Sequence, residues 1–248
     1  METQKGKNLV IEITAISFLL IFIVVCIYVL INLDSVVNHF VEKPIAVSIK
    51  EEIISDWAKD CSQPTPEGKA ENIDLSSKTG LKMTNSKIYY EIRGTNESEI
   101  IYQFKKCGPH LYDAITYSVI NNRYSYDDMS DKICNIQDFA VGVNSVILYP
   151  KWDNSRNTDQ KLNEKWDKYM VALQIHENKH VDIAEKNAKK VYSYLQTLQE
   201  NKTCLPSAKY LDNKLKELSE QMEADNQEYD YNTMHGQTQG AIFNASPI

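Results

Sequence analysis

The sequence lacks the motifs with which proteins usually bind nucleotides and nucleic acids. It contains no Walker loop and no GxGxxG fingerprint, and its net charge of −7 is not accompanied by a basic stripe. It also has no internal repeat, no low-complexity tract and no C-x-x-C pair. We therefore expect neither nucleic acid nor nucleotide as a partner, and we do not expect a zinc site made of cysteines.

Histidine is scarce, with five among 248 residues, yet two of them stand in the segment HENKH at residues 176–180. On a helix, residues four apart share one face, so His176 and His180 can hold one zinc ion together. Glu177 points to the same cleft and could take a proton from water whose pKa the zinc lowers to about 7. Two exposed histidines would look the same, but apolar residues at helical spacing favour a partly buried face: Leu173, Ile183 and Ala184. The motif predicts metal-assisted hydrolysis, usually of a peptide bond.

Residues 13–33 form an almost uninterrupted apolar run, and about 20 such residues are enough to cross a bilayer. A cleavable signal peptide is the alternative, because Lys5 and Lys7 give a basic start, but no A-x-A-like cleavage site follows the run. We expect one uncleaved transmembrane helix at residues 13–33, with residues 1–12 in the cytoplasm. The remainder would then be periplasmic or extracellular, anchored at the inner membrane.

The number of cysteines is consistent with a domain located outside the cytoplasm. Cys26 lies in the apolar run and leaves an even number of cysteines, in a compartment that permits disulfides: Cys61, Cys107, Cys134 and Cys204. Four cysteines allow three pairings, and the spacing does not choose among them.

After the predicted span, residues 34–80 resemble a stalk, because Pro64, Pro66 and Gly68 do not fit regular structure. Residues 81–243 would form the folded domain and residues 244–248 a tail. Strands are expected at 88–92, 114–126 and 133–148, and helices at 97–106, 161–199 and 207–229. Alternating polarity within residues 139–148 predicts an antiparallel sheet with one solvent-exposed face. The fold class is α+β, with a small antiparallel sheet packed against the long HENKH helix and a second, antiparallel helix, in a zincin-like arrangement.

A catalytic zinc site normally has three protein ligands, so a third must come from elsewhere. The candidates are His110, His235, Glu220, Glu223 and Asp225. We favour His235, because the two glycines that follow it let the backbone fold closely around a site. Tyr229 or Tyr231 nearby could donate a hydrogen bond to the developing oxyanion, and we assign that role to Tyr229.

The chain resembles a bacterial family catalogued as domain of unknown function 922, described as predicted secreted zinc-dependent proteases. The resemblance covers roughly residues 82–243. It rests on YYEIRG at 89–94 with Gly108-Pro109, the 116–126 strand, Cys134, LYPKW at 148–152, HENKH, Cys204 and YDYNTMHGQTQGA at 229–241.

The resemblance implies that His176 and His180 bind zinc, that Glu177 is the base and that His235 belongs to the site. It also implies that Cys134 pairs with Cys204, which leaves Cys61 and Cys107 as a second candidate pair. The chain departs from the family at Tyr149, where an apolar residue is usual, and in its uncleaved anchor.

Taken together, these features predict a membrane-anchored, outward-facing zinc metalloprotease that acts on a peptide or protein in the cell envelope. Two alternatives stay open. The same site could cleave an amide in cell-wall peptide, or the chain could be an envelope scaffold or binding module with a structural metal. Glu177 counts against the scaffold, since a structural site needs no base.

Overall fold

The computed structural model describes residues 61–62, 64–66, 75, 80–109, 112–129, 132–156 and 159–243. The chain divides after Ser48 into two compact units, of which the first lies outside the described residues. The second unit, residues 49–248, contains HENKH.

Three long strands and one two-residue strand form a mixed sheet. The strands are β1 (Thr65–Pro66), β2 (Gly80–Arg93), β3 (Ile115–Met129) and β4 (Lys132–Asp153), arranged in the order β1-β2-β4-β3. β3 runs antiparallel to β4 as expected, but β2 runs parallel to it. The prediction of a purely antiparallel sheet is wrong. After β2 the chain crosses through helix α3 (Glu97–Cys107) and β3 before it returns as β4, and such a crossover is what a parallel pair requires.

β4 lies between the two other long strands of this sheet, and every residue from Phe139 to Pro150 is buried. The prediction that one face of residues 139–148 would be exposed to water is therefore wrong. Both neighbours of β4 are long, since β2 pairs with it from Gly80 onward and β3 from Ile115 onward. The sequence pattern located the strand but not its depth in the fold.

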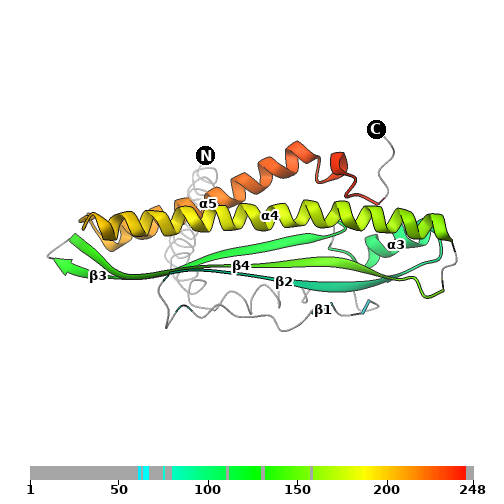
Figure 1. The fold of residues 1–248 in the computed structure, drawn as a ribbon, viewed down its shortest axis with the longest axis horizontal. Helices are drawn as coiled ribbons and strands as arrows, with labels where there is room; N and C mark the ends of the chain where they lie inside the picture. The colour runs from blue at the N-terminus through cyan, green and yellow to red at the C-terminus, as the bar shows by residue number, and fades with distance from the viewer. Residues whose placement is uncertain are drawn as a thin grey trace, which may run out of the picture. The chain divides into compact units, whose positions relative to one another are not determined.

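Two long helices follow the sheet, close to the predicted bounds. Helix α4 (Gln160–Glu200) begins at Asp159, whose carboxylate accepts hydrogen bonds from the first free backbone N–H groups. Helix α5 (Ala208–Thr233) begins in the same way at Ser207. α4 lies along the sheet and α5 packs on α4 (Figure 1). This agrees with the predicted α+β class and the predicted helix pair.

The main core lies where α4 meets β4 and the first half of α5. Its helix residues recur every three or four positions, which places them on one side of α4. They are Ala184, Ala188, Val191, Leu195 and Leu198, packed with Phe139, Val141 and Val143 of β4 and with Leu211 and Leu215 of α5. Burying this stripe fixes the rotation of α4 about its axis, so the preceding turns, which carry HENKH, also face inward.

The chain turns sharply at the end of α5. Met234, His235 and Gly236 all have left-handed backbone conformations, and the 3-10 helix η1 (Gln237–Gln239) follows them. The chain then folds back to Phe243, which is buried in an aromatic cluster with Phe104, Trp166 and Tyr169. The C-terminal segment is thereby held next to the N-terminal half of α4.

The disulfide implied by the family resemblance and the second candidate pair are both present. Cys134 of β4 is bonded to Cys204, just after α4, and Cys61 is bonded to Cys107 at the end of α3. β1 pairs with β2 near the second bridge. Part of the segment predicted as a stalk, residues 34–80, is therefore attached to the domain.

The predicted architecture needs a further correction. No helix among the described residues is long and apolar enough to cross a membrane, and residues 13–33 lie outside the described residues. The fold is accordingly an α+β domain with a mixed sheet and no assigned membrane helix. The predicted single-pass location at the inner membrane has no support in the described residues.

Candidate metal centre

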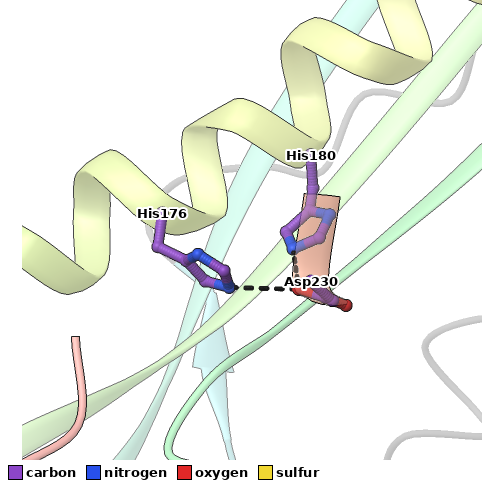
Figure 2. A group of neighbouring side chains, drawn as sticks. All are labelled: His176, His180 and Asp230. Atoms are coloured by element: carbon purple, nitrogen blue, oxygen red, sulfur yellow. Dashed lines mark ion pairs between the residues drawn. The ribbon is translucent and has the colours of Figure 1, made fainter. Parts of the chain in front are cut away.

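His176 and His180 leave α4 one turn apart and point toward the same carboxylate of α5 (Figure 2). The Nε2 atom of His176 lies 3.3 Å from Asp230 Oδ1, and the Nε2 atom of His180 lies 3.2 Å from the same oxygen. The three residues form a group that could hold a metal ion, with one ligand atom from each within 4.8 Å of the others. Both histidines are buried and Asp230 is half-buried.

The opposite side of each imidazole is also held. His176 Nδ1 is 2.9 Å from Gln239 Oε1, and His180 Nδ1 is 3.0 Å from Asn226 Oδ1. An amide oxygen can only accept, so each Nδ1 carries its hydrogen and donates it. In the neutral imidazole the lone pair is then on Nε2, the atom that faces Asp230. Such outer partners orient metal-binding histidines in many proteins.

This donor set fits a zinc-like ion. Two Nε2 lone pairs and a carboxylate oxygen converge, so the space between them favours a positive charge, either a proton or a metal cation. Four ligands placed tetrahedrally about 2.0–2.1 Å from a zinc ion would be roughly 3.3 Å apart. The two separations from Asp230 Oδ1, 3.3 and 3.2 Å, match that spacing, and all three ligand atoms lie within 4.8 Å of one another.

Charge complementarity also appears in the pKa values of the group. Burial by itself would raise the pKa of Asp230, but hydrogen bonds with His176 and His180 outweigh it and hold that pKa well below its usual range. Burial would lower the pKa of His180, but its contacts with Asp230 and Asn226 prevail and raise it. A metal would compete with the proton on Nε2, so metal binding at this group would release protons as it occurs.

Glu177 lies beside the group, on the sheet side of α4. Its carboxylate is buried, and Oε2 accepts a hydrogen bond of 2.7 Å from the Thr116 hydroxyl of β3. Burial raises the pKa of Glu177, against the opposing effects of that hydrogen bond and of the two histidines. A carboxylate in this state is a stronger base than one in water, and its orientation is fixed.

Tyr229 forms part of the wall around the histidines. Its ring is stacked on His176 with centroids 5.0 Å apart and meets His180 edge-on at 5.1 Å. Its hydroxyl is 3.1 Å from the Gln239 side chain. Gly236 approaches His176 closely from the C-terminal turn, since a Cβ placed there would lie 3.2 Å from His176 Cγ.

His176, Glu177, His180 and Asp230 line a cleft of about 610 Å³, whereas Tyr229 is not one of its lining residues. One wall comes from the first residues of β3, which is an edge strand of the described sheet, and the other comes from the second half of α5. His176, Glu177 and His180 all line the cleft between these walls. A ligand in the cleft would contact both the base and the metal group.

The other described residues predicted as zinc ligands or as the oxyanion donor lie outside the metal group. His235 lines the cleft but does not join the metal group; its Nδ1 is 3.8 Å from Asp230 Oδ2, and its half-exposed ring lies 5.3 Å from that of Tyr112. Tyr231 is 82% exposed. Glu220 and Asp225 form ion pairs with lysines, and His110 lies outside the described residues.

Sequence reasoning missed Asp230, Asn226, Gln239 and Thr116. One signal was present: Asn226 and Asp230 are four residues apart, so they share a face of α5 just as His176 and His180 share a face of α4. No local signal pointed to Thr116 or Gln239, which are 61 and 63 residues from their partners.

Residues 87–236 match the family described as "Bacterial protein of unknown function (DUF922)". This chain belongs to that family. No curated protein and no solved structure matches it. The matched range contains the two histidines, Glu177 and Asp230, so the family region includes every member of the candidate metal group. Gln239 lies three residues beyond its end.

Proposed function

We propose that this DUF922 protein is a zinc-dependent hydrolase that cleaves peptide bonds. The observation that carries the proposal is the buried carboxylate of Glu177 in the same cleft as three converging ligand atoms. A site that only holds a metal for stability needs no such base. Two histidines and one carboxylate are also a donor set of catalytic zinc sites, which keep a fourth position for water or substrate.

The division of work follows from the contacts. His176, His180 and Asp230 would hold zinc, which when bound lowers the pKa of water and polarises a carbonyl group. Thr116 fixes Oε2 of Glu177, and we expect Oε1 to take the proton from the attacking water. Glu177 would then return that proton to the leaving amine.

His235 and Tyr229 have different proposed roles. His235 faces Oδ2 of Asp230, the oxygen turned away from the two Nε2 atoms, so we assign it to the cleft wall and not to the ligand set. Tyr229 packs on both imidazoles and contacts Gln239. We keep Tyr229 as the proposed donor to the developing oxyanion, a role that requires its hydroxyl to turn from Gln239 toward the substrate.

The test compares the zinc content and peptide hydrolysis of the wild type, Glu177→Gln and Glu185→Gln. Glu185 is on the same helix and does not line the cleft, so it controls for the loss of one charge from α4. We expect about one zinc per chain in all three proteins, with hydrolysis falling at least about 100-fold in Glu177→Gln alone. Equal hydrolysis by wild type and Glu177→Gln, or none by wild type against a broad peptide library, would overturn the proposal.

A further inference from the structure

The cleft has more negative charges than one bound divalent metal ion would neutralise. Four carboxylates line it, those of Asp113, Glu177, Glu223 and Asp230, and none of the described residues that line it is a lysine or an arginine. A divalent cation would balance two of these charges. Asp113 and Glu223 remain as the uncompensated pair.

Asp113 marks one end of the cleft. Its Oδ2 accepts hydrogen bonds from the Tyr169 hydroxyl at 3.1 Å and from the backbone N–H of Phe243 at 3.3 Å. Tyr169 is about two turns before His176 on α4, so Asp113 lies beyond the metal group in that direction. Within the described part of the chain, Oδ1 has no hydrogen-bond partner. Burial raises the pKa of Asp113, so its ionised form would gain from a positively charged neighbour.

Glu223 marks the opposite end. It is exposed and accepts a hydrogen bond of 3.0 Å from Gln227 Nε2, one turn further along α5. It precedes Asn226, which contacts His180. Because α5 runs antiparallel to α4, Glu223 lies on the far side of the metal group from Asp113. The two carboxylates therefore flank the reacting centre along the direction of α4.

Some other acidic residues of α5 have lysine partners within the chain. Asp225 is paired with Lys186 and Lys190, and Glu220 is paired with Lys216. Among the described residues, no lysine or arginine lies within ion-pair distance of Asp113 or Glu223. Both carboxylates line the cleft, and no described lysine or arginine neutralises them there.

We propose that the cleft selects peptides with positively charged side chains on both sides of the bond that is cleaved. The position of the bond relative to the two charges rests on the proposed function. The preference for binding positively charged peptides requires only the cleft. A lysine or arginine beside Asp113 would donate to its Oδ1, and a second one would pair with Glu223. A peptide with acidic side chains at these positions would meet two like charges.

Binding can be measured without turnover, on the full chain carrying Glu177→Gln and loaded with zinc. Three fluorescein-labelled peptides of identical length would differ only in two flanking residues, which are lysine, glutamine or glutamate. By fluorescence anisotropy we expect the lysine peptide to bind at least about tenfold more tightly than the glutamate peptide at low salt. This ratio should shrink as salt screens the charges.

Variants identify the carboxylates responsible. Glu223→Lys, added to Glu177→Gln, should lower the ratio by about fivefold or more. Glu228→Lys makes the same charge change on the exposed side of α5, outside the cleft, and should leave the ratio nearly unchanged. Asp113→Asn, added to Glu177→Gln, should also lower the ratio. Equal binding of the three peptides, or an equal effect of Glu223→Lys and Glu228→Lys, would overturn the inference.

Measuring cleavage by the wild type distinguishes the proposed hydrolysis from the proposed peptide preference. Selective binding of lysine peptides by Glu177→Gln, with no cleavage of the same peptides by wild type, would overturn the proposed hydrolysis and support the binding inference. Cleavage by wild type with no preference for basic flanking residues would support hydrolysis and overturn the inference. Cleavage sites can be read by mass spectrometry of the products.

Discussion

Gln239 accepts a hydrogen bond of 2.9 Å from His176 Nδ1, although the two residues are 63 positions apart. This contact joins the C-terminal turn to the HENKH helix. It fixes which nitrogen of His176 carries its hydrogen, and so leaves Nε2 as the atom available to a metal. The turn that follows α5 therefore belongs to the candidate metal centre as much as α4 does.

Removing that contact should weaken metal binding without unfolding the domain. We expect Gln239→Ala to lower zinc affinity by about 10–100-fold, the usual cost of losing an outer partner of a metal-binding histidine. Gln237→Ala, in the same 3-10 helix, changes a side chain with no hydrogen bond to either histidine and should change affinity by less than about threefold. Competition with a chromophoric chelator measures both. Equal affinities of wild type and Gln239→Ala would show that Gln239 does not support the site.

The third ligand can be tested by comparing Asp230 with His235. If Asp230 is a ligand, Asp230→Asn should lower zinc affinity by more than about 100-fold, because it removes the negative charge that both Nε2 atoms face. His235→Ala should lower it by at most about fivefold, since His235 is half-exposed and its ion pair is with the other oxygen of Asp230, at 3.8 Å. The reverse order of the two effects would restore His235 as the ligand.

Gly236 has no room for a side chain. Its φ is +81°, and an added Cβ would lie 2.8 Å from Ala241 Cβ and 3.2 Å from His176 Cγ. We expect Gly236→Ala to lower the free energy of unfolding by about 2–4 kcal/mol through strain and overpacking, and to displace His176.

Gly240 offers the matched control for this substitution. Its φ is +79°, but the nearest atom to an added Cβ is 3.8 Å away, so Gly240→Ala should cost only about 1–2 kcal/mol and leave zinc affinity unchanged. Urea unfolding and chelator competition together measure both effects. Similar losses of zinc affinity in the two variants would contradict a role for the close contact with His176.

Asp113 should make stability depend on pH in a predictable direction. Burial raises its folded-state pKa above the unfolded value of about 4, so the folded protein favours the protonated acid. The contribution of Asp113 to stability is therefore complete below the unfolded pKa and is lost as pH rises through the folded pKa. Asp113→Asn does not titrate, so its stability relative to wild type should increase from pH 3 to pH 8. Denaturation at several pH values measures the difference, and a constant or decreasing difference would contradict the raised pKa.

How far the sequence could predict the site depended on whether each contact was local. The four-residue spacing of His176 and His180 is a property of one helix, so it identified both side chains and the adjacent base before any fold was known. Asp230 is adjacent to Tyr229, the predicted oxyanion donor, but the sequence pattern favoured His235 as the third ligand. The choice between neighbours depended on which side of α5 faces α4, and on the left-handed turn that directs His235 to the cleft wall.

The sequence by itself determined the α+β class, the bounds of α4 and α5, and the pair of histidines with its glutamate, because helical periodicity and capping are local. Only the tertiary structure decided that β2 runs parallel to β4, that Asp230 completes the metal group, and that Asn226, Gln239 and Thr116 orient the side chains around it. These contacts join segments tens of residues apart. Their geometry depends on how α5 and the C-terminal turn pack against α4, which no single segment encodes.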